Sequence, residues 1–149
     1  MKFELKFEFM ALFKDIGVFV LGVVLGALVN GALVSAGAEW IPLPDGLPPE
    51  ANMQTPEGLR AAAPFLKPMN FLFPWLAHAV GTFAGALVVA RWGSATYRSR
   101  WAYTVGILFL LGGISMAFLV PDPLWFIVLD LTTAYLPPVW LALRWGRGV

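Results

Sequence analysis

Four long apolar segments dominate the pattern of hydrophobic and polar positions along the chain. They cover residues 16–38, 71–90, 102–120 and 124–143. A helix needs about 20 residues to cross roughly 30 Å of hydrocarbon, and each segment is close to that length. The pattern therefore predicts an all-α integral membrane protein, a four-helix bundle that forms a single membrane domain over residues 1–149.

Composition agrees with this prediction and removes several classes of function. Hydrophobic residues make up 59% of the 149 residues and charged residues 13%, with a mean hydropathy of +0.75; soluble domains carry about 25% charge. The net charge of +1 offers no basic surface for nucleic acid. With no cysteine and one histidine, the chain cannot form disulfides, thiolate metal sites or multi-histidine metal sites. No strong catalytic motif is present, and we expect a non-enzymatic protein.

The basic residues fall mainly on one side of the predicted helices. If the helices alternate in direction, eight share that side: Lys2, Lys6, Lys14, Arg91, Arg98, Arg100, Arg144 and Arg147. Only Arg60 and Lys67 lie on the other. Because Lys and Arg are enriched on the cytoplasmic side of membrane proteins, we expect both termini in the cytoplasm. Tryptophans gather near the helix ends, as in interfacial belts. They are Trp40, Trp75 and Trp125 on the outer side and Trp92, Trp101, Trp140 and Trp145 on the inner side.

The N-terminal segment has a different pattern from the four helices. Residues 2–9 alternate polar and apolar side chains, a period typical of a strand. We expect this segment either to pair with a partner subunit or to form a helix at the membrane surface. The small residues at 36–38 resemble a signal-peptide cleavage site. The apolar run before them exceeds the usual length of about 7–15 residues, so we expect a retained helix.

Two connections carry turn and capping signals. The loop 39–70 is long, external and rich in proline, and its Thr-Pro-Glu sequence at 55–57 predicts the start of a short helix. This loop is either a lid or docking surface, or a simple tether. The Pro-Asp-Pro sequence at 121–123 predicts a tight hairpin between the third and fourth helices. Asp122 is then the N-cap and Pro123 the first helical residue.

Small residues at helical spacing mark the surfaces where helices pack closely. They are Gly22 and Gly26 in the first helix, Ala77, Gly81 and Gly85 in the second, and Gly106, Gly112 and Gly113 in the third. Lipid supplies no hydrophobic drive between helices, so close contact at small residues must supply it. The pattern leaves open whether they serve the bundle or another chain.

A double proline, Pro137 and Pro138, interrupts the fourth helix. Each proline lacks a backbone donor, so carbonyl groups one turn earlier lose their helical partner. One interpretation is a kink in which Thr132 or Thr133 hydroxyls satisfy the backbone. The other is an ion site of the kind found at broken helices in transporters.

Each predicted helix contributes one polar residue at a similar depth. Counted inward from the outer surface at 1.5 Å per residue, these residues lie roughly 8–12 Å into the hydrocarbon. They are Asn30, His78, Ser115 and Asp130. Ionisable groups at this depth normally face the interior and pair with each other. We therefore predict a contact between His78 and Asp130, with Asn30 or Ser115 completing the hydrogen bonds.

This intramembrane polar cluster is open to several interpretations. It could simply clip the helices together, or the His78–Asp130 pair could hold and pass a proton or small solute. His78 is also a candidate ligand for a chlorophyll-type pigment or one face of a haem, because small residues flank it. Ser115, His78 and Asp130 have the residue types of a serine hydrolase, but the sequence around Ser115 lacks a matching motif. We predict no metal and no cofactor.

The second half of the chain resembles a set of small, uncharacterised bacterial four-helix membrane proteins. The residues that carry the resemblance are 78–86, with the sequence His-Ala-Val-Gly-Thr-Phe-Ala-Gly-Ala, and 121–126, 129–131 and 135–137. The resemblance covers roughly the last 80 residues. It implies a four-helix fold and a multi-pass protein of the bacterial inner membrane, and it implies no activity.

The sequence favours an accessory or scaffolding subunit that packs against a larger membrane protein complex. Its expected partners are the lipid bilayer and either other membrane proteins or further copies of the chain. The first alternative is a small transporter or channel for protons or a small solute, built around His78 and Asp130. The second alternative is a membrane carrier of a pigment or haem bound by His78.

Overall fold

The structure is a computed structural model that describes residues 2–53, 55–120 and 122–146; Pro121 and Arg147, used in the predictions above, lie outside this range. The described chain is all-α and contains no β-strand. Its elements are α1 (Lys2–Trp40), α2 (Pro56–Ala62), η1 (Ala63–Phe65), η2 (Pro68–Phe71), α3 (Leu72–Trp92), α4 (Arg98–Leu119), α5 (Leu124–Thr133) and α6 (Leu136–Gly146).

Four helical segments are long and apolar enough to cross a membrane, as predicted. They are Phe9–Trp40, Pro68–Trp92, Arg98–Leu119 and Leu124–Gly146. The first helix begins far earlier than expected, because α1 already starts at Lys2. Of the two alternatives for residues 2–9, the structure shows a helix, although this helix continues into α1 and is not a separate segment. A helix pairs its backbone groups within one segment, whereas a lone strand leaves them without partners.

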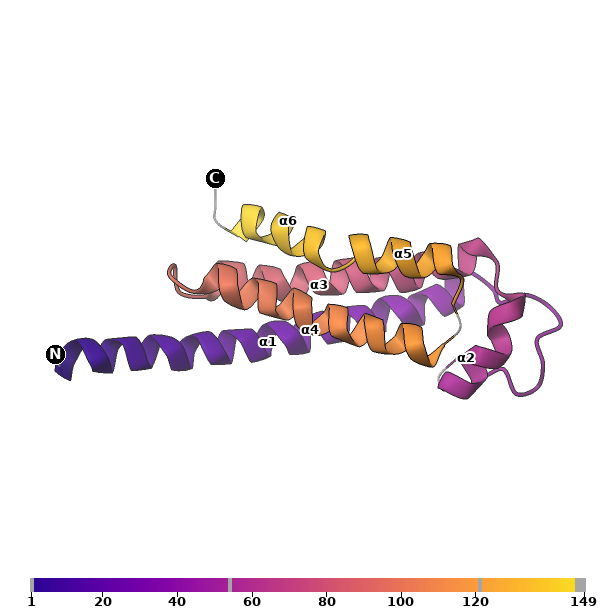
Figure 1. The fold of residues 1–149 in the computed structure, drawn as a ribbon, viewed down its shortest axis with the longest axis horizontal. Helices are drawn as coiled ribbons and strands as arrows, with labels where there is room; N and C mark the ends of the chain where they lie inside the picture. The colour runs from indigo at the N-terminus through magenta and orange to yellow at the C-terminus, as the bar shows by residue number, and fades with distance from the viewer. Residues whose placement is uncertain (1, 54, 121, 147–149) are drawn as a thin grey trace.

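Helix α3 is the centre of the arrangement and contacts α1, α4 and α6 (Figure 1). Near the end of α3 that leads into α4, buried residues of α3, α4 and α6 form an apolar core. They are Ala86, Val89, Ala90, Ala102, Val105, Val139, Ala142 and Leu143. Apart from Leu143, the side chains in this core are small or β-branched, so the three helices approach closely there.

The contact between α1 and α3 is made by glycines on both helices. A Cβ atom on Gly22 would lie 2.6 Å from the carbonyl oxygen of Gly85, and one on Gly26 would lie 2.7 Å from that of Gly81. Side chains cannot fit at these positions, so backbone meets backbone. This finding answers the question that the sequence left open, because these glycines serve contacts within the chain.

The other predicted packing residues divide between buried and open positions. Ala77 is fully buried, and a Cβ atom on Gly106 would lie 2.6 Å from a methyl group of Val139. Gly112 has open space where its Cβ atom would be, so it takes no part in packing within the chain. Gly113 is also closely packed, against a tyrosine described below.

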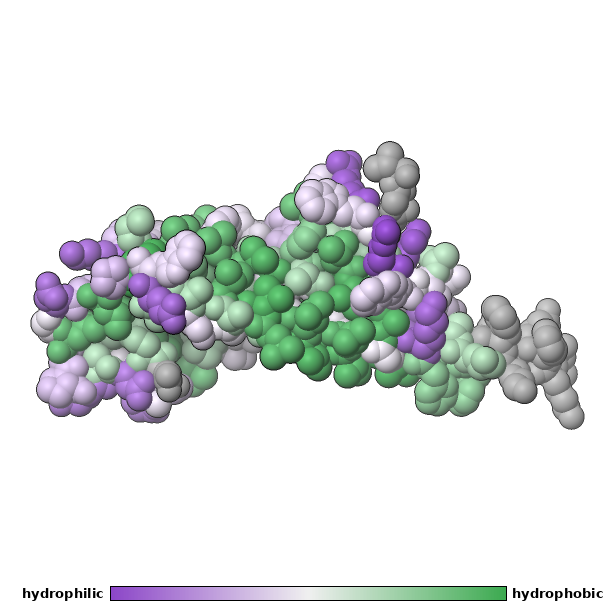
Figure 2. Space-filling model, turned by 180° about the vertical axis from the view of Figure 1, so that it is seen from behind, coloured by the Kyte–Doolittle hydropathy of each residue, from purple (hydrophilic) through white to green (hydrophobic). Residues whose placement is uncertain are grey.

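The two ends of the molecule are polar and the middle is apolar. In Figure 1 the long loop and the α4–α5 turn lie at one end, called the loop end below. The start of α1, the α3–α4 turn and the end of α6 lie toward the opposite end. Figure 2 shows a hydrophobic band between hydrophilic ends. Exposed tryptophans flank it, Trp40 and Trp125 at the loop end and Trp92 and Trp145 at the opposite end. This distribution suits a bilayer.

The long loop contains the predicted short helix. The Thr55 side chain accepts a hydrogen bond from the Gly58 backbone N–H at 3.1 Å, with Pro56 in the first turn of α2. Arg60 donates from Nε to the carbonyl oxygen of Leu119, at 2.5 Å. A cation at the last carbonyls of a helix is favourable, so this contact fixes α2 against the end of α4.

The α4–α5 turn differs from its prediction in how α5 is capped. Pro123 occupies the N-cap position of α5, and no side chain caps the helix, so the predicted N-cap at Asp122 is wrong. Proline needs no donor at this position, and the Asp122 side chain is therefore free to point elsewhere. Only residues 120–123 separate the end of α4 from the start of α5, so the two helices are joined by a short connection, as predicted.

The helix break at the double proline is present. Helix α5 ends at Thr133 and α6 begins at Leu136, with Ala134 and Tyr135 between them. The predicted satisfaction of the freed carbonyls by hydroxyls is not seen. Thr132 and Thr133 instead donate to Val128 and Leu129, one turn earlier in α5.

A buried carboxylate that the sequence analysis did not single out joins α1 to the α3–α4 turn. Asp15 is 1% exposed and accepts hydrogen bonds from the Ser94 backbone N–H at 2.7 Å and the Ser94 hydroxyl at 2.5 Å. A buried carboxylate requires such donors, because water is absent. Its role is to hold the turn in place.

Candidate functional site

The centre of the candidate site is a hydrogen-bonded pair of ionisable residues on two helices. His78 Nδ1 lies 2.8 Å from Asp130 Oδ1, so the predicted contact between α3 and α5 is present. The Asp130 side chain is 6% exposed and that of His78 26% exposed. Burial of a single carboxylate in an apolar segment is costly, so the partner is needed.

Tyr135 is the third member of the cluster, which we call the His78–Asp130–Tyr135 cluster. Its hydroxyl donates to Asp130 Oδ2 at 2.9 Å, and its ring stacks on the His78 ring with centroids 5.7 Å apart. Both carboxylate oxygens of Asp130 therefore have a partner. Tyr135 is buried, 2% exposed.

The helix break and a glycine together make room for Tyr135. In an unbroken helix a residue five positions after Asp130 would point roughly 140° away from it, since each residue turns about 100°. The break before α6 lets Tyr135 turn back toward the carboxylate. On α4, a Cβ atom at Gly113 would lie within clashing distance of the Tyr135 hydroxyl, so only glycine fits there.

A second polar contact joins α3 and α5. Its α3 residue, Trp75, lies about one helical turn nearer the loop end than His78. Trp75 donates from Nε1 to the Thr133 hydroxyl oxygen at 2.8 Å. That hydroxyl in turn donates to the carbonyl oxygen of Leu129 at 2.7 Å. The tryptophan that we predicted for the interfacial belt is thus also bonded to the helix that carries Asp130.

The other two residues of the predicted polar layer do not join the pair. Ser115 is exposed and donates to the carbonyl oxygen of Leu111 in its own helix at 2.8 Å. Asn30 packs against Gly81, on the α1 side of α3. Depth along a helix fixes the height of a residue but not the direction in which it points, and Ser115 points away from the cluster.

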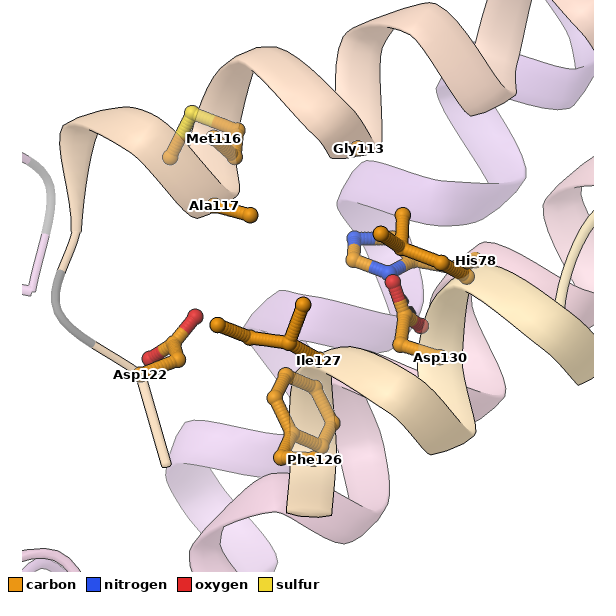
Figure 3. A pocket seen from close by; sticks show the side chains of 9 residues that line it. His78, Gly113, Met116, Ala117, Asp122, Phe126, Ile127 and Asp130 are labelled. Atoms are coloured by element: carbon orange, nitrogen blue, oxygen red, sulfur yellow. Dashed lines mark hydrogen bonds and ion pairs between the residues drawn. The ribbon is translucent and has the colours of Figure 1, made fainter. Parts of the chain in front are cut away.

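The site opens into a small pocket, shown in Figure 3. Its volume is about 30 Å³, enough for one or two water molecules. The lining residues come from α3, α4, α5 and the α4–α5 turn: His78, Gly113, Met116, Ala117, Asp122, Phe126, Ile127, Asp130 and Leu131. The ring nitrogen of His78 that does not face Asp130 points into this space, and a carboxylate oxygen of Asp122 points into it from the opposite side (Figure 3).

Asp122 is half-buried at the mouth of the pocket. Burial raises the pKa of its carboxyl group above the usual value. The negative charge of Asp130 raises this pKa further, and the charge of His78 opposes the change. Asp122 therefore takes up a proton more readily than an exposed aspartate.

On α3, Thr82 is the last polar residue near the cluster, one helical turn beyond His78. Thr82 is fully buried, and its hydroxyl has no hydrogen-bond partner in the described structure. Beyond it, toward the end opposite the loop, lies the apolar core of α3, α4 and α6. The cluster thus has a water-sized pocket on one side and closely packed apolar residues on the other.

The arrangement can do proton chemistry with its own residues. If Nδ1 of His78 carries the hydrogen that is donated to Asp130, the second nitrogen is free to accept a proton from the pocket. Tyr135 is the residue that sequence reasoning missed. Its position two residues before the double proline was the available signal, since the side chain next to a break can point back.

Comparisons with protein-family models, with curated proteins and with solved structures give no match. They also do not bear on the resemblance to small bacterial membrane proteins, which stays a prediction. The function is therefore inferred from the residues of the site themselves.

Proposed function

We propose that the chain is a four-helix bundle of the bacterial inner membrane, with both termini cytoplasmic, that binds and passes protons at the His78–Asp130–Tyr135 cluster. The observation that carries this proposal is the 2.8 Å contact between His78 and Asp130 within helices long enough to span a membrane. Intramembrane pairs of this kind are typical of proton relays.

Protonation of the cluster needs no partner beyond the residues present. A proton accepted by the free ring nitrogen of His78 makes an imidazolium ion, which the adjacent Asp130 carboxylate stabilises. Tyr135 occupies the second carboxylate oxygen and holds the carboxylate in place. For net transport the protein must change conformation, so that this proton is released on the opposite side of the membrane.

The size of the pocket favours a proton over a larger solute. A volume of about 30 Å³ holds one or two waters but no organic molecule. The pigment or haem alternative also has less support, because of the positions of the small residues beside His78. Of the small residues that suggested it, Ala77 and Gly81 are buried and Ala79 is half-buried, and Gly81 packs directly against Gly26 of α1.

Proton movement can be tested with the purified chain in liposomes that contain a pH-sensitive dye. A potassium gradient with valinomycin drives the flux. We expect wild-type liposomes to acidify or alkalise faster than empty ones, and Asp130→Asn and His78→Gln to remove the difference. Ser115→Ala is the matched control, because Ser115 bonds only within its own helix. Equal flux in wild-type protein and Asp130→Asn would overturn the proposal.

The accessory-subunit reading is the second candidate, and one observation favours it. Large apolar side chains of α1 are exposed along much of the helix, including Val20, Leu21, Val24 and Leu28. A neighbouring membrane protein or lipid must cover them. However, the glycines that suggested outside contacts pack within the chain, with the exception of Gly112, and residues 2–9 continue α1.

Mild-detergent extraction followed by size-exclusion chromatography and mass spectrometry tests this second candidate. A subunit elutes in a large assembly with defined partners. Elution as a single chain, with no partner protein in the peak, would remove the accessory-subunit reading and leave proton handling.

A further inference from the structure

The pocket beside His78 leads in one direction, toward the loop end of the molecule. On the α4 side its wall is made of Met116 and Ala117, and on the α5 side Ile127 contributes. Asp122 also lines the pocket. It lies in the turn that joins these two helices, between the membrane-crossing segments Arg98–Leu119 and Leu124–Gly146. Its side chain is half-buried, and one carboxylate oxygen points into the pocket.

The opposite direction is closed by packing. Thr82 is the polar residue one turn beyond His78, and it is fully buried. Past it, Val139 of α6 fills the space at Gly106 of α4, where a Cβ atom would be 2.6 Å away. The apolar core then continues to Ala90, which lies against Gly146. A proton has no chain of polar groups to follow through these described residues.

Few charged or titratable groups face His78. Asp130 contacts it from α5, Tyr135 stacks on it from the helix break, and Asp122 faces it across the pocket. The α4 residues of the pocket wall are uncharged, and Asn30 of α1, near Gly81, is uncharged too. Asp122 is therefore the group best placed to exchange protons with the free nitrogen of His78.

We infer that Asp122 relays protons between water at the loop end and His78 through the pocket, so that this conformation gives the cluster access from the loop end only. The inference rests on the proposed function and names its route. The Asp122 carboxylate takes a proton from bulk water and gives it to a pocket water. That water passes a proton to His78 Nε2, and release follows the reverse order, with no change in oxidation state.

The single histidine of the chain makes the relay directly measurable. Protein labelled with ¹⁵N and ¹³C in histidine only, in lipid nanodiscs, gives NMR signals from His78 alone. We expect Asp122→Asn to slow the exchange of the His78 Nε2 proton with water by about tenfold or more, because a positioned acid–base group is lost. The signature of the Nδ1 bond to Asp130 should persist, which shows that the cluster is intact.

Asp45→Asn is the matched control. Asp45 is an exposed acid in the long loop, at the same end of the molecule as Asp122, and it does not line the pocket, so we expect no change in exchange. If Asp122→Asn leaves the exchange rate at the wild-type value while the Asp130 bond persists, the relay is overturned. If Asp122→Asn disrupts that bond, the exchange rates of Asp122→Glu, which keeps the carboxylate, and Asp122→Gln are compared instead. Equal rates in these two variants then overturn the relay.

One-sided access is tested in liposomes with uniformly oriented protein. Trypsin cleavage after Arg60, which is exposed and followed by Ala61, reports on which side the loop lies. We expect a pH jump on the loop side to shift the NMR signals of His78. The same jump on the other side should leave these signals unchanged over the same period. Equal responses from both sides would overturn one-sided access.

These outcomes separate the relay from the proposed function. Slow exchange in Asp122→Asn without any transmembrane flux in the wild type keeps the relay and removes proton transport. Flux that depends on Asp130 but not on Asp122, with unchanged exchange, keeps proton transport and removes the relay.

Discussion

Helix α3 meets α1 and α5 through two contrasting surfaces. Toward α1 it presents Gly81 and Gly85, and the two backbones touch with no side chain between them. Toward α5 it presents His78 and Trp75, which reach across by hydrogen bonds and leave a water-sized pocket. Both surfaces hold helices together, but only the second leaves polar atoms accessible.

The contrast shows how a small membrane protein can separate adhesion from chemistry. Close backbone contact supplies van der Waals attraction without polar groups, and it tolerates no added atoms. Polar contacts between helices each add little stability, on average about 0.6 kcal/mol, but they bring ionisable groups together. Stability should therefore respond most to the α1–α3 surface and proton chemistry most to the α3–α5 surface.

The largest expected effect tests the glycine surface. Gly22→Ala together with Gly26→Ala should lower the free energy of unfolding by about 1–3 kcal/mol per site, because each new methyl group meets a carbonyl oxygen at 2.6–2.7 Å. Unfolding with SDS in mixed micelles measures the change. Gly17→Ala with Gly31→Ala is the control on the same helix, since both positions have open space. An equal loss in both pairs would show that close packing is not the cause.

The next effect concerns the space for Tyr135. Gly113→Ala should cost about 1–3 kcal/mol and shift the NMR signals of His78, because the new methyl group displaces the tyrosine hydroxyl from Asp130. Gly112→Ala, one residue earlier, meets nothing and should change neither. Unchanged His78 signals in Gly113→Ala would mean that Tyr135 is not held as described.

A smaller effect on stability is expected from the polar contacts themselves. Tyr135→Phe and Trp75→Phe each remove one hydrogen bond between described residues, and each should cost about 0.6 kcal/mol in the same unfolding measurement. Only Tyr135→Phe should alter the NMR signals of His78, because Trp75 bonds to Thr133 and not to the cluster. If both variants change these signals equally, the cluster extends further than we propose.

The smallest effect concerns Asp122 and pH. Its pKa is raised in the folded protein by burial and by the charge of Asp130, so folding favours the protonated form. Stability is then greatest below the ordinary value of 3.8 and falls as the pH rises and the carboxyl ionises. Asp122→Asn should be more stable than wild type at neutral pH, by less than about 0.5 kcal/mol. The difference should vanish below pH 3.8, which unfolding at several pH values can check; a gain that persists there contradicts the explanation.

Some features followed from the sequence because their causes are local. Four apolar runs of membrane length predict four helices, since the hydrocarbon leaves no other partner for the backbone. Thr55 before Pro56 predicts a helix start, and the double proline at residues 137 and 138 predicts a break. The contact between His78 and Asp130 was also predictable, because the depths of two ionisable residues can be counted along their helices.

Other features depended on how each helix is rotated about its own axis, and depth alone does not give that rotation. Ser115 has the expected height but points away from the pair, whereas Tyr135 reaches the pair only because the helix breaks before it. The partners of Gly22 and Asp15, on α3 and in the α3–α4 turn, were likewise decided by tertiary packing. The sequence determined that four helices form and which polar residues they contain. The close fit of backbone against backbone then selected which of those residues face each other, because only certain rotations bring glycine opposite glycine.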